Sequence, residues 1–137
     1  MLEPKKLLVV VTGSRDYPDL VTVRDWSRSL PSYAYLMEGE ARGVDQCARD
    51  GFLESHDTSQ LISRPAQWSR YGGSAGPTRN QEMVHEATDM KGSGWEVQVV
   101  AFWNKNGPGT GTPDMIRKSR CAGLSVEVRL PKGVIDE

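Results

Sequence analysis

Apolar and polar positions along the chain follow two different periods, and these predict alternating strands and helices. Residues 7–11 are a continuous apolar run, Leu-Leu-Val-Val-Val, which is typical of a strand covered on both faces. Residues 96–102 are again nearly all apolar. Shorter runs at 33–37 and 60–63 predict two further strands, and the alternating run at 125–130 predicts an edge strand.

Between these runs, apolar residues recur at helical spacing. The clearest pattern spans residues 44–55, where five small or apolar side chains share one face: Val44, Cys47, Ala48, Gly51 and Phe52. Residues 19–30, 79–90 and 113–122 predict three more helices. Strands that alternate with helices in this way indicate the α/β class.

The predicted fold is a Rossmann-like, doubly wound sheet of about five parallel strands, in the order 3-2-1-4-5, with helices on both faces. Residues 1–137 form a single domain in this interpretation, with a core from about 7 to 130, because a chain of 137 residues suits one domain. In such sheets ligands bind outside the carboxyl ends of the strands. Binding residues are therefore expected in the loops that follow the strands.

Composition narrows the classes of partner. The net charge is −1, from 17 basic and 18 acidic residues, so the chain as a whole does not attract nucleic acid. No apolar run approaches the roughly 18 to 20 residues that span a bilayer. Residues 1–6 lack the apolar core of a signal peptide. We therefore expect a cytoplasmic protein that does not bind a membrane, and for which nucleic acid is a disfavoured partner.

Cysteine and histidine give no sign of a metal or redox centre. Cys47 and Cys121 fall in helical patterns and are expected to be buried as small hydrophobic side chains. His56 and His85 fall on polar faces of predicted helices, and no Cys, His and Asp cluster has the spacing of a metal site. No metal and no required cofactor are therefore expected.

The loop after the first strand reads Thr12-Gly13-Ser14-Arg15. A glycine between two hydroxyl residues exposes backbone N–H groups, and Arg15 adds a positive charge, which suits an anionic ligand. In the alternative interpretation, Thr12 and Ser14 only satisfy the backbone of a turn. This loop alone does not decide between the two.

The loop after the second strand places Arg42 between Gly39 and Gly43, and a helix is expected to open at Gly43. Backbone amides and a guanidinium are therefore predicted to converge at a helix N-terminus, where the helix dipole favours negative charge. Asp45 has two interpretations. It is either an acid favoured by the dipole or the partner of a ligand hydroxyl, such as one of a ribose.

Two glycine-rich segments complete the predicted site. Residues 107–112, Gly-Pro-Gly-Thr-Gly-Thr, match neither a dinucleotide-binding fingerprint nor a Walker loop, but they let a ligand approach the backbone. Thr112 is expected to cap the following helix. Residues 65–78 are interpreted as a long surface loop. In it Trp68 either stacks on a base or packs the loop down, and Arg79 at the next helix start is expected to bind phosphate.

Four segments together resemble the SLOG superfamily: Thr12–Arg15, Gly39–Asp45, Ala75–Met83 and Gly109–Thr112. This superfamily includes the Smf/DNA-processing-protein-A proteins and the "Lonely guy" (LOG) hydrolases. The nearest likeness is to the small YspA/YpsA-related branch of bacterial and phage proteins. The likeness extends from about residue 7 to 128 and implies a Rossmann-like fold with a pocket for nucleotides. The resemblance also implies a possible homodimer.

The resemblance also implies roles for individual residues. Arg79 corresponds to the catalytic arginine of the LOG hydrolases, and Asp114 to the first of their two acids, whereas Met115 stands in place of the second. The catalytic candidates are therefore Arg79 and Asp114. The predicted ligand-binding residues are Thr12, Gly13, Ser14, Arg15, Gly39, Glu40, Ala41, Arg42, Gly43, Asp45, Trp68, Arg79, Asn80, Met83, Gly109, Thr110, Gly111 and Thr112.

Three functions remain open at this point. The first is a protein that binds a nucleotide or nucleotide-derived phosphoribosyl ligand, as a sensor or sequestering protein. The second is a phosphoribohydrolase that cleaves the N-glycosidic bond of a nucleoside monophosphate, with Asp114, Glu40 or Asp45 as the acting carboxylate. The third is a single-stranded DNA binding module. Because Met115 replaces the second acid of the LOG hydrolases, a binding protein is favoured over a hydrolase. The nearly neutral net charge disfavours the DNA-binding module.

Overall fold

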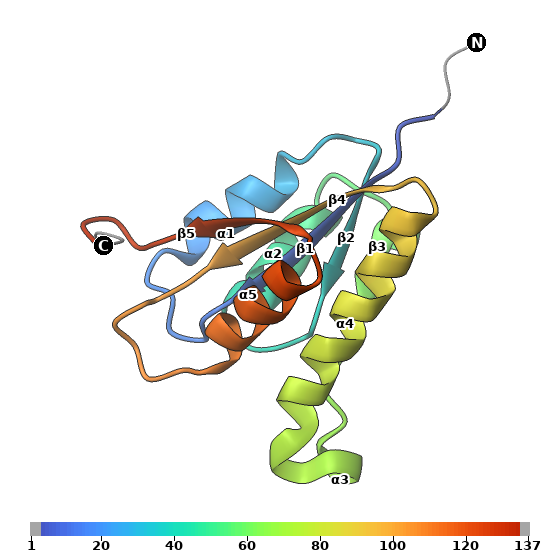
Figure 1. The fold of residues 1–137 in the computed structure, drawn as a ribbon. Helices are drawn as coiled ribbons and strands as arrows, with labels where there is room; N and C mark the ends of the chain where they lie inside the picture. Colours follow the sequence, from blue (N-terminus) through green and yellow to red (C-terminus); the bar gives the residue numbers. More distant parts are fainter. Residues whose placement is uncertain (1–3, 135–137) are drawn as a thin grey trace.

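The computed structural model describes residues 4–134. Five strands within this range form one sheet (Figure 1). All neighbouring strands are parallel, and their order is β3-β2-β1-β4-β5. The predicted fold class and strand order are therefore confirmed. The strands are β1 (Leu7–Gly13), β2 (Ala34–Glu38), β3 (Leu61–Ser63), β4 (Glu96–Phe102) and β5 (Ser125–Arg129).

The central strand β1 is covered on both faces. Leu8 and Val10 pack into the hydrophobic cluster on one side of the sheet, and Val9 and Val11 into the cluster on the other side. All four are buried. This is why the run lacks the alternation of a half-exposed strand. β5 lies at an edge of the sheet, as its alternating pattern predicts.

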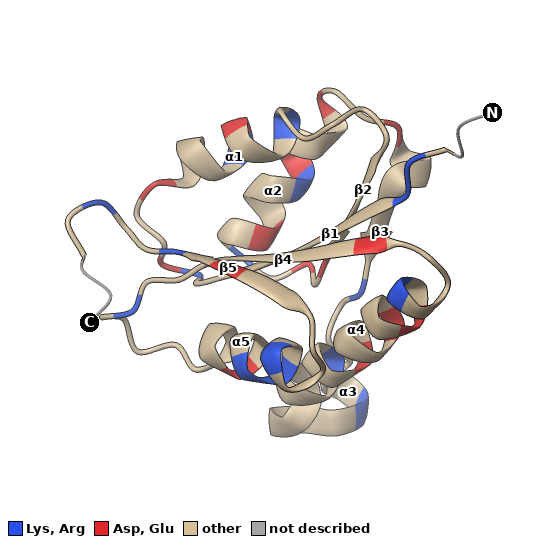
Figure 2. Cartoon of the chain, turned by 45° about the horizontal axis from the view of Figure 1, so that its top comes forward, with Lys and Arg blue, Asp and Glu red and all other residues tan. Residues whose placement is uncertain are grey.

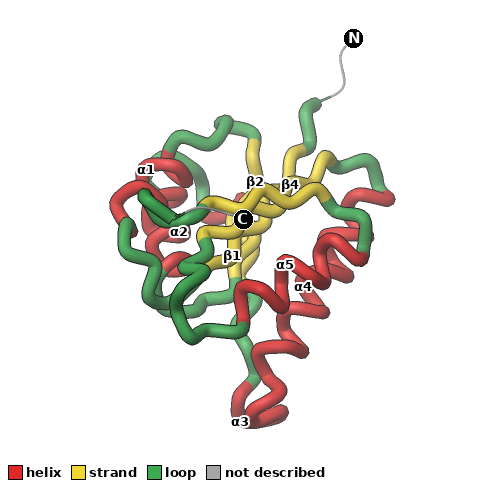
Figure 3. The backbone as a smooth tube through the Cα atoms, turned by 60° about the vertical axis from the view of Figure 1, so that its left-hand side comes forward, coloured by secondary structure: helices red, strands yellow, loops and turns green. Residues whose placement is uncertain are grey.

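Helices cover both faces of the sheet, so the domain has three layers (Figures 2 and 3). One face carries α1 (Leu20–Arg28) and α2 (Val44–Leu53), and the other carries α4 (Ala75–Gly92) and α5 (Gly111–Cys121). Helices α1 and α2 also contact each other closely. A Cβ at Gly51 would lie 2.3 Å from the Arg24 carbonyl oxygen, so only glycine fits at this crossing.

The interpretation of residues 65–78 as a loop is wrong. The segment contains a short helix, α3 (Trp68–Tyr71), then a 3-10 turn, η2 (Gly72–Ser74), and α4 already begins at Ala75. Ala75 is fully buried and fixes the first turn of α4. Pro77 is tolerated there because its missing N–H would have had no partner inside the helix. The glycine and proline residues at the start of this helix were therefore mistaken for those of a loop.

Other boundaries also differ from the sequence interpretation. Thr110, not Thr112, is the N-cap residue of α5, and Thr112 is buried in its first turn. Gln60 belongs to the 3-10 helix η1 (Thr58–Gln60) that precedes β3. Cys121 is exposed and Cys47 only partly buried, because both lie beside the buried stripes of their helices. In the described part of the chain no helix is long and apolar enough to cross a membrane.

Candidate functional site

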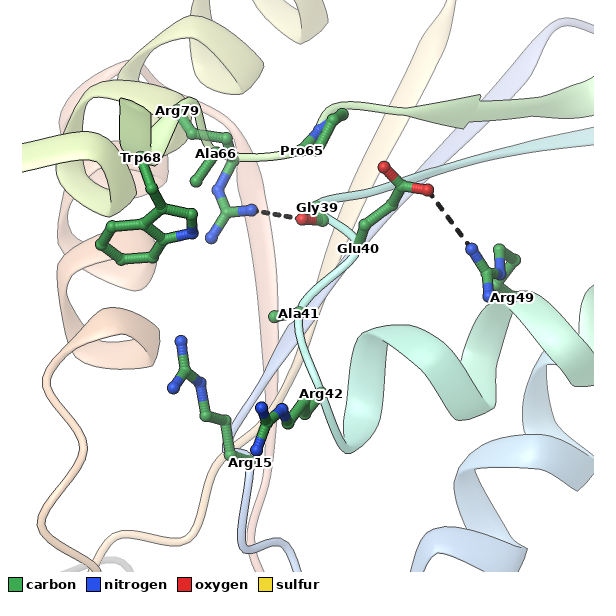
Figure 4. A pocket seen from close by; sticks show the side chains of 10 residues that line it. All are labelled: Arg15, Gly39, Glu40, Ala41, Arg42, Arg49, Pro65, Ala66, Trp68 and Arg79. Atoms are coloured by element: carbon green, nitrogen blue, oxygen red, sulfur yellow. Dashed lines mark hydrogen bonds and ion pairs between the residues drawn. The ribbon is translucent and has the colours of Figure 1, made fainter. Parts of the chain in front are cut away.

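The loops at the carboxyl ends of β1, β2 and β4 surround two adjoining clefts. We call the first the arginine cleft; its volume is about 700 Å³, and Figure 4 shows its lining. We call the second the glycine cleft; its volume is about 660 Å³. Four residues line both and make them continuous: Arg15, Ala41, Trp68 and Arg79. Each volume lies within the range of small-molecule sites.

The arginine cleft contains cations that the protein itself does not neutralise. Arg15 comes from the β1–α1 loop and Arg42 from the β2–α2 loop (Figure 4). Neither side chain makes a hydrogen bond or ion pair with residues 4–134. Arg49, by contrast, is paired with Glu40 at 3.3 Å. The free charge of this cleft therefore comes from Arg15, Arg42 and the nearby Arg79.

Arg79 is held in a fixed orientation between the two clefts. Its Nη1 donates to the main-chain oxygen of Gly39, and its Nε donates to Asn80 Oδ1 at 3.0 Å. Asn80 is buried and in turn donates to the Gly111 carbonyl at 3.2 Å. The expectation that Arg79 starts a surface helix is wrong, because it lies in the second turn of α4 and is partly buried. Its Nη2 has no partner within residues 4–134.

Three helices begin at the clefts, and none has a capping side chain. The N-cap residues of α2, α4 and α5 are Gly43, Ser74 and Thr110, and none of them makes a side-chain capping hydrogen bond. Helix α1 differs from these three. Its N-cap residue Asp19 lines neither cleft, and the Asp19 side chain accepts a hydrogen bond from Thr22 N. First-turn N–H groups lack partners within a helix, and the helix dipole attracts anions to them. The uncapped ends of α2 and α5 therefore favour an anionic ligand. The start of α4 contributes less, because Ala75 N already donates to the Gly72 carbonyl and Pro77 has no N–H.

Glycines of the site have two different roles. A Cβ at Gly13 would lie 2.5 Å from Val44, and one at Gly43 would lie 2.6 Å from the Arg15 carbonyl oxygen. These two glycines let the β1–α1 loop pack against the start of α2. At Gly109 and Gly111 a Cβ would meet nothing within 4 Å. Internal packing does not require glycine there, whereas close approach of a ligand to the backbone would.

Two buried carboxylates organise the β2–α2 loop. Glu38 is fully buried and accepts from Glu40 N at 2.6 Å and from Ser63 Oγ at 2.8 Å. Asp45 is 5% exposed, and its Oδ2 accepts from Gly39 N at 3.1 Å and from Ala41 N at 3.3 Å. Of the amides predicted to converge at the start of α2, those of residues 39–41 therefore point to these acids instead.

The acids at the clefts differ in protonation. Burial raises the pKa of Asp45 to about 7, the nearby charge of Glu38 adds to the rise, and Arg79 opposes it. Burial also raises the pKa of Glu38. Partial burial alone would raise the pKa of Asp114, but hydrogen bonds from Lys118 and Asn80 outweigh it and lower that pKa. Asp45 therefore titrates near neutrality, whereas Asp114 stays ionised.

The positions of Ser14 and Trp68 bear on two alternatives that the sequence left open. The Ser14 hydroxyl accepts from Asn104 N at 2.9 Å, which ties the β1–α1 loop to the β4–α5 loop. This residue satisfies the backbone and lines the glycine cleft at the same time. The Trp68 side chain is not packed down: it is 54% exposed and lines both clefts.

Most of the predicted residues come together in the clefts. Those that line one or both clefts are Thr12, Gly13, Ser14, Arg15, Gly39, Glu40, Ala41, Arg42, Asp45, Trp68, Arg79, Asn80, Gly109, Thr110, Gly111, Thr112 and Asp114. Two do not. Gly43 packs against Arg15, and Met83 is buried in the core between α4 and the sheet.

The sequence interpretation missed several residues of the site. Glu38, which is fully buried, had one signal in the sequence: it is an acidic residue at the end of an apolar strand. The N-terminal turn of α4 was hidden by its loop-like composition. Glu38 lies beneath the clefts and lines neither; the lining residues that were missed are Asp16, Arg49, Pro65, Ala66, Gly73, Gly76, Pro77, Pro108 and Arg117.

No family model, no curated protein and no solved structure matches this chain. Within residues 4–134 no group of three His, Cys, Asp or Glu is placed to hold a metal ion. Functional inference therefore depends on the charge, the exposed backbone and the shape of the two clefts.

Proposed function

We propose that the protein binds a nucleotide or a nucleotide-derived phosphoribosyl compound in the two clefts, as a sensor or sequestering protein that needs no cofactor. The observation that carries this proposal is the cluster of Arg15, Arg42 and Arg79 beside helix ends that lack capping side chains. Guanidinium groups and free helix N-termini are both strong partners for phosphate.

The phosphate fits best in the arginine cleft. Arg15 and Arg42 bring positive charge that no acid of the described chain neutralises. The first turns of α4 and α5 line the glycine cleft next to it, through Gly76 and Gly111. A phosphate at the junction would meet guanidinium groups on one side and unpaired amides on the other.

The nucleoside fits best in the glycine cleft. Its wall of unobstructed glycines accepts a flat or bulky group, and the exposed Trp68 ring at the junction offers an aromatic face for a base. The resemblance to the SLOG superfamily supports the same ligand class.

Hydrolysis of the ligand is less well supported than binding. Asp114 is surrounded by Asn80, Arg117 and Lys118, which hydrogen-bond to its carboxylate. These partners occupy both carboxylate oxygens, so Asp114 is poorly placed to activate water or to stabilise a positively charged transition state. The arrangement suits a carboxylate that anchors the first turn of α5.

Single-stranded DNA is also a less suitable ligand. Basic and acidic residues are interspersed along α1, α2, α4 and α5 (Figure 2), whereas a strand would need a positive groove that follows its backbone. Three arginines without an acidic partner, Arg15, Arg42 and Arg79, instead gather at the arginine cleft, which suits a compact anion.

Isothermal titration calorimetry tests the proposal with AMP, GMP, CMP, UMP and ribose 5-phosphate. We expect at least one compound to bind, and Arg42→Ala to weaken its binding by about tenfold to a hundredfold, because a charge-assisted hydrogen bond is lost. Arg120→Ala, an exposed change on α5 that lines neither cleft, is the control and should leave binding unchanged. Absence of binding by all five compounds would overturn the proposal.

A further inference from the structure

Asp45 is a buried carboxylate with only one of its oxygens in use. Oδ2 accepts from the amides of Gly39 and Ala41, which fixes the side chain against the β2–α2 loop. Oδ1 is buried and has no hydrogen-bond partner within residues 4–134. The residue also lines the glycine cleft.

Glu38 provides the comparison within the same loop. It is buried as deeply as Asp45, yet both of its oxygens accept hydrogen bonds, from Glu40 N and Ser63 Oγ. A buried carboxylate oxygen without a donor loses its hydration and gains nothing in return. The unused oxygen of Asp45 therefore fits a donor that the protein does not supply.

A hydroxyl is the donor that the surroundings favour. A phosphate would be repelled by Asp45 and by the neighbouring Glu38, whereas a neutral hydroxyl donates without adding charge. Arg79 lies close enough to influence Asp45 electrostatically and lines both clefts. A ligand with its phosphate near Arg79 could thus direct its sugar, which follows the phosphate through the 5′ oxygen and carbon, towards Asp45.

We propose that Asp45 accepts a hydrogen bond from a ribose hydroxyl, so that the site selects ribonucleotides over deoxyribonucleotides. This inference rests on the proposed nucleotide binding and adds the class of sugar. It makes Asp45 a specificity-determining residue, whereas the arginines determine affinity for the phosphate.

Wild-type protein provides the first test, by calorimetry with AMP, GMP, CMP and UMP and with the 2′-deoxy and 3′-deoxy form of each. We expect at least one deoxy form of a bound ribonucleotide to bind about tenfold to a hundredfold more weakly, because it leaves a buried acceptor unpaired. Equal affinity of the ribonucleotide and both deoxy forms would overturn the selection and leave nucleotide binding intact. If no ribonucleotide binds, this inference fails, and if ribose 5-phosphate does not bind either, the proposed function fails with it.

Asp45→Asn provides the second test, because its carbonyl oxygen keeps the bonds from Gly39 and Ala41 while its amide replaces the free acceptor. We expect the preference for the ribonucleotide to fall by about tenfold or more. Asp50→Asn, on the same helix but outside both clefts, is the matched control and should keep the wild-type preference. A preference that survives in Asp45→Asn, with a folded circular dichroism spectrum, would contradict the role of Asp45.

Discussion

The side chain of Arg79 on α4 donates a hydrogen bond to the main-chain oxygen of Gly39, which directly follows β2. A single guanidinium thereby joins the helix on one face of the sheet to the loop that leads to the other face. A Cβ at Gly39 would lie 2.2 Å from Arg79 Nη1, so this contact exists only because residue 39 is glycine. Neither residue can change without moving the other.

Gly39→Ala should therefore displace the Arg79 side chain. We expect the substitution to cost about 1 kcal/mol of the free energy of unfolding, because a flexible side chain can move aside but loses its hydrogen bond. Nucleotide binding should weaken nearly as much as in Arg79→Ala. Urea unfolding and calorimetry measure both effects. Gly109→Ala, where a Cβ meets nothing in the unliganded protein, is the stability control; a Gly39→Ala variant that binds like wild type would contradict the role given to this contact.

Arg79→Ala and Arg42→Ala should separate binding from stability. Both variants should bind a nucleotide about tenfold to a hundredfold more weakly. Only Arg79→Ala should also destabilise the fold, by about 1 to 2 kcal/mol, since it removes bonds to Gly39 and Asn80 while Arg42 has no such partners. Thermal unfolding of the two variants and wild type compares their melting temperatures. Equal melting temperatures would show that Arg79 does not hold the loop.

Asp45 should make the protein less stable as the pH rises. Its pKa in the folded protein is about 7, above the roughly 3.9 of an unfolded chain, so folding favours the protonated form. The stability that this group contributes is complete below the unfolded pKa and is lost as pH rises to about 7. Glu38, whose pKa is also raised, acts in the same direction.

Asp45→Asn should flatten this dependence. Between pH 4 and 8 the variant should lose less stability than wild type and be more stable above pH 7 by roughly 1 to 3 kcal/mol. Urea unfolding at half-unit pH steps measures the curve, and Asp50→Asn should run parallel to wild type. Parallel curves for Asp45→Asn and wild type would mean that Asp45 is ionised throughout this range.

Asp114→Asn distinguishes a binding protein from a hydrolase. For a binding protein we expect unchanged or slightly tighter binding, because the acid repels phosphate, and no release of free base from AMP, GMP, CMP or UMP. A hydrolase that depends on this acid would lose base release by about a hundredfold or more. Chromatography of the reaction mixture measures the base. Release by wild type that disappears in Asp114→Asn, with binding unchanged, would favour the enzyme.

The central position of β1 and β4 and the position of the cleft loops could be predicted because their signals are local. The apolar runs at residues 7–11 and 96–102 each require cover on both faces, and this places them at the centre of the sheet. The start of α4 could not be predicted in the same way. Its glycine and proline also suit a loop, and the burial of Ala75 that accompanies the helical turn has no local signal.

The electrostatic details of the site depend on contacts that sequence spacing does not reveal. Asp45 in a first helical turn is equally consistent with a solvated acid favoured by the dipole. Its burial follows from the way the loop folds back so that Gly39 N and Ala41 N reach its carboxylate. The pairing of Arg79 with Gly39 likewise joins residues forty positions apart.

The central claim is that a nucleotide occupies the two clefts at the carboxyl end of the sheet. The most direct measurement is a proton–nitrogen correlation NMR titration of the whole chain with AMP, GMP, CMP and UMP. The account predicts that the largest shifts occur at the amides of Gly76, Gly109 and Gly111 and at the indole N–H of Trp68. Shifts absent with all four nucleotides, or concentrated on α1 and β5 away from these loops, would contradict it.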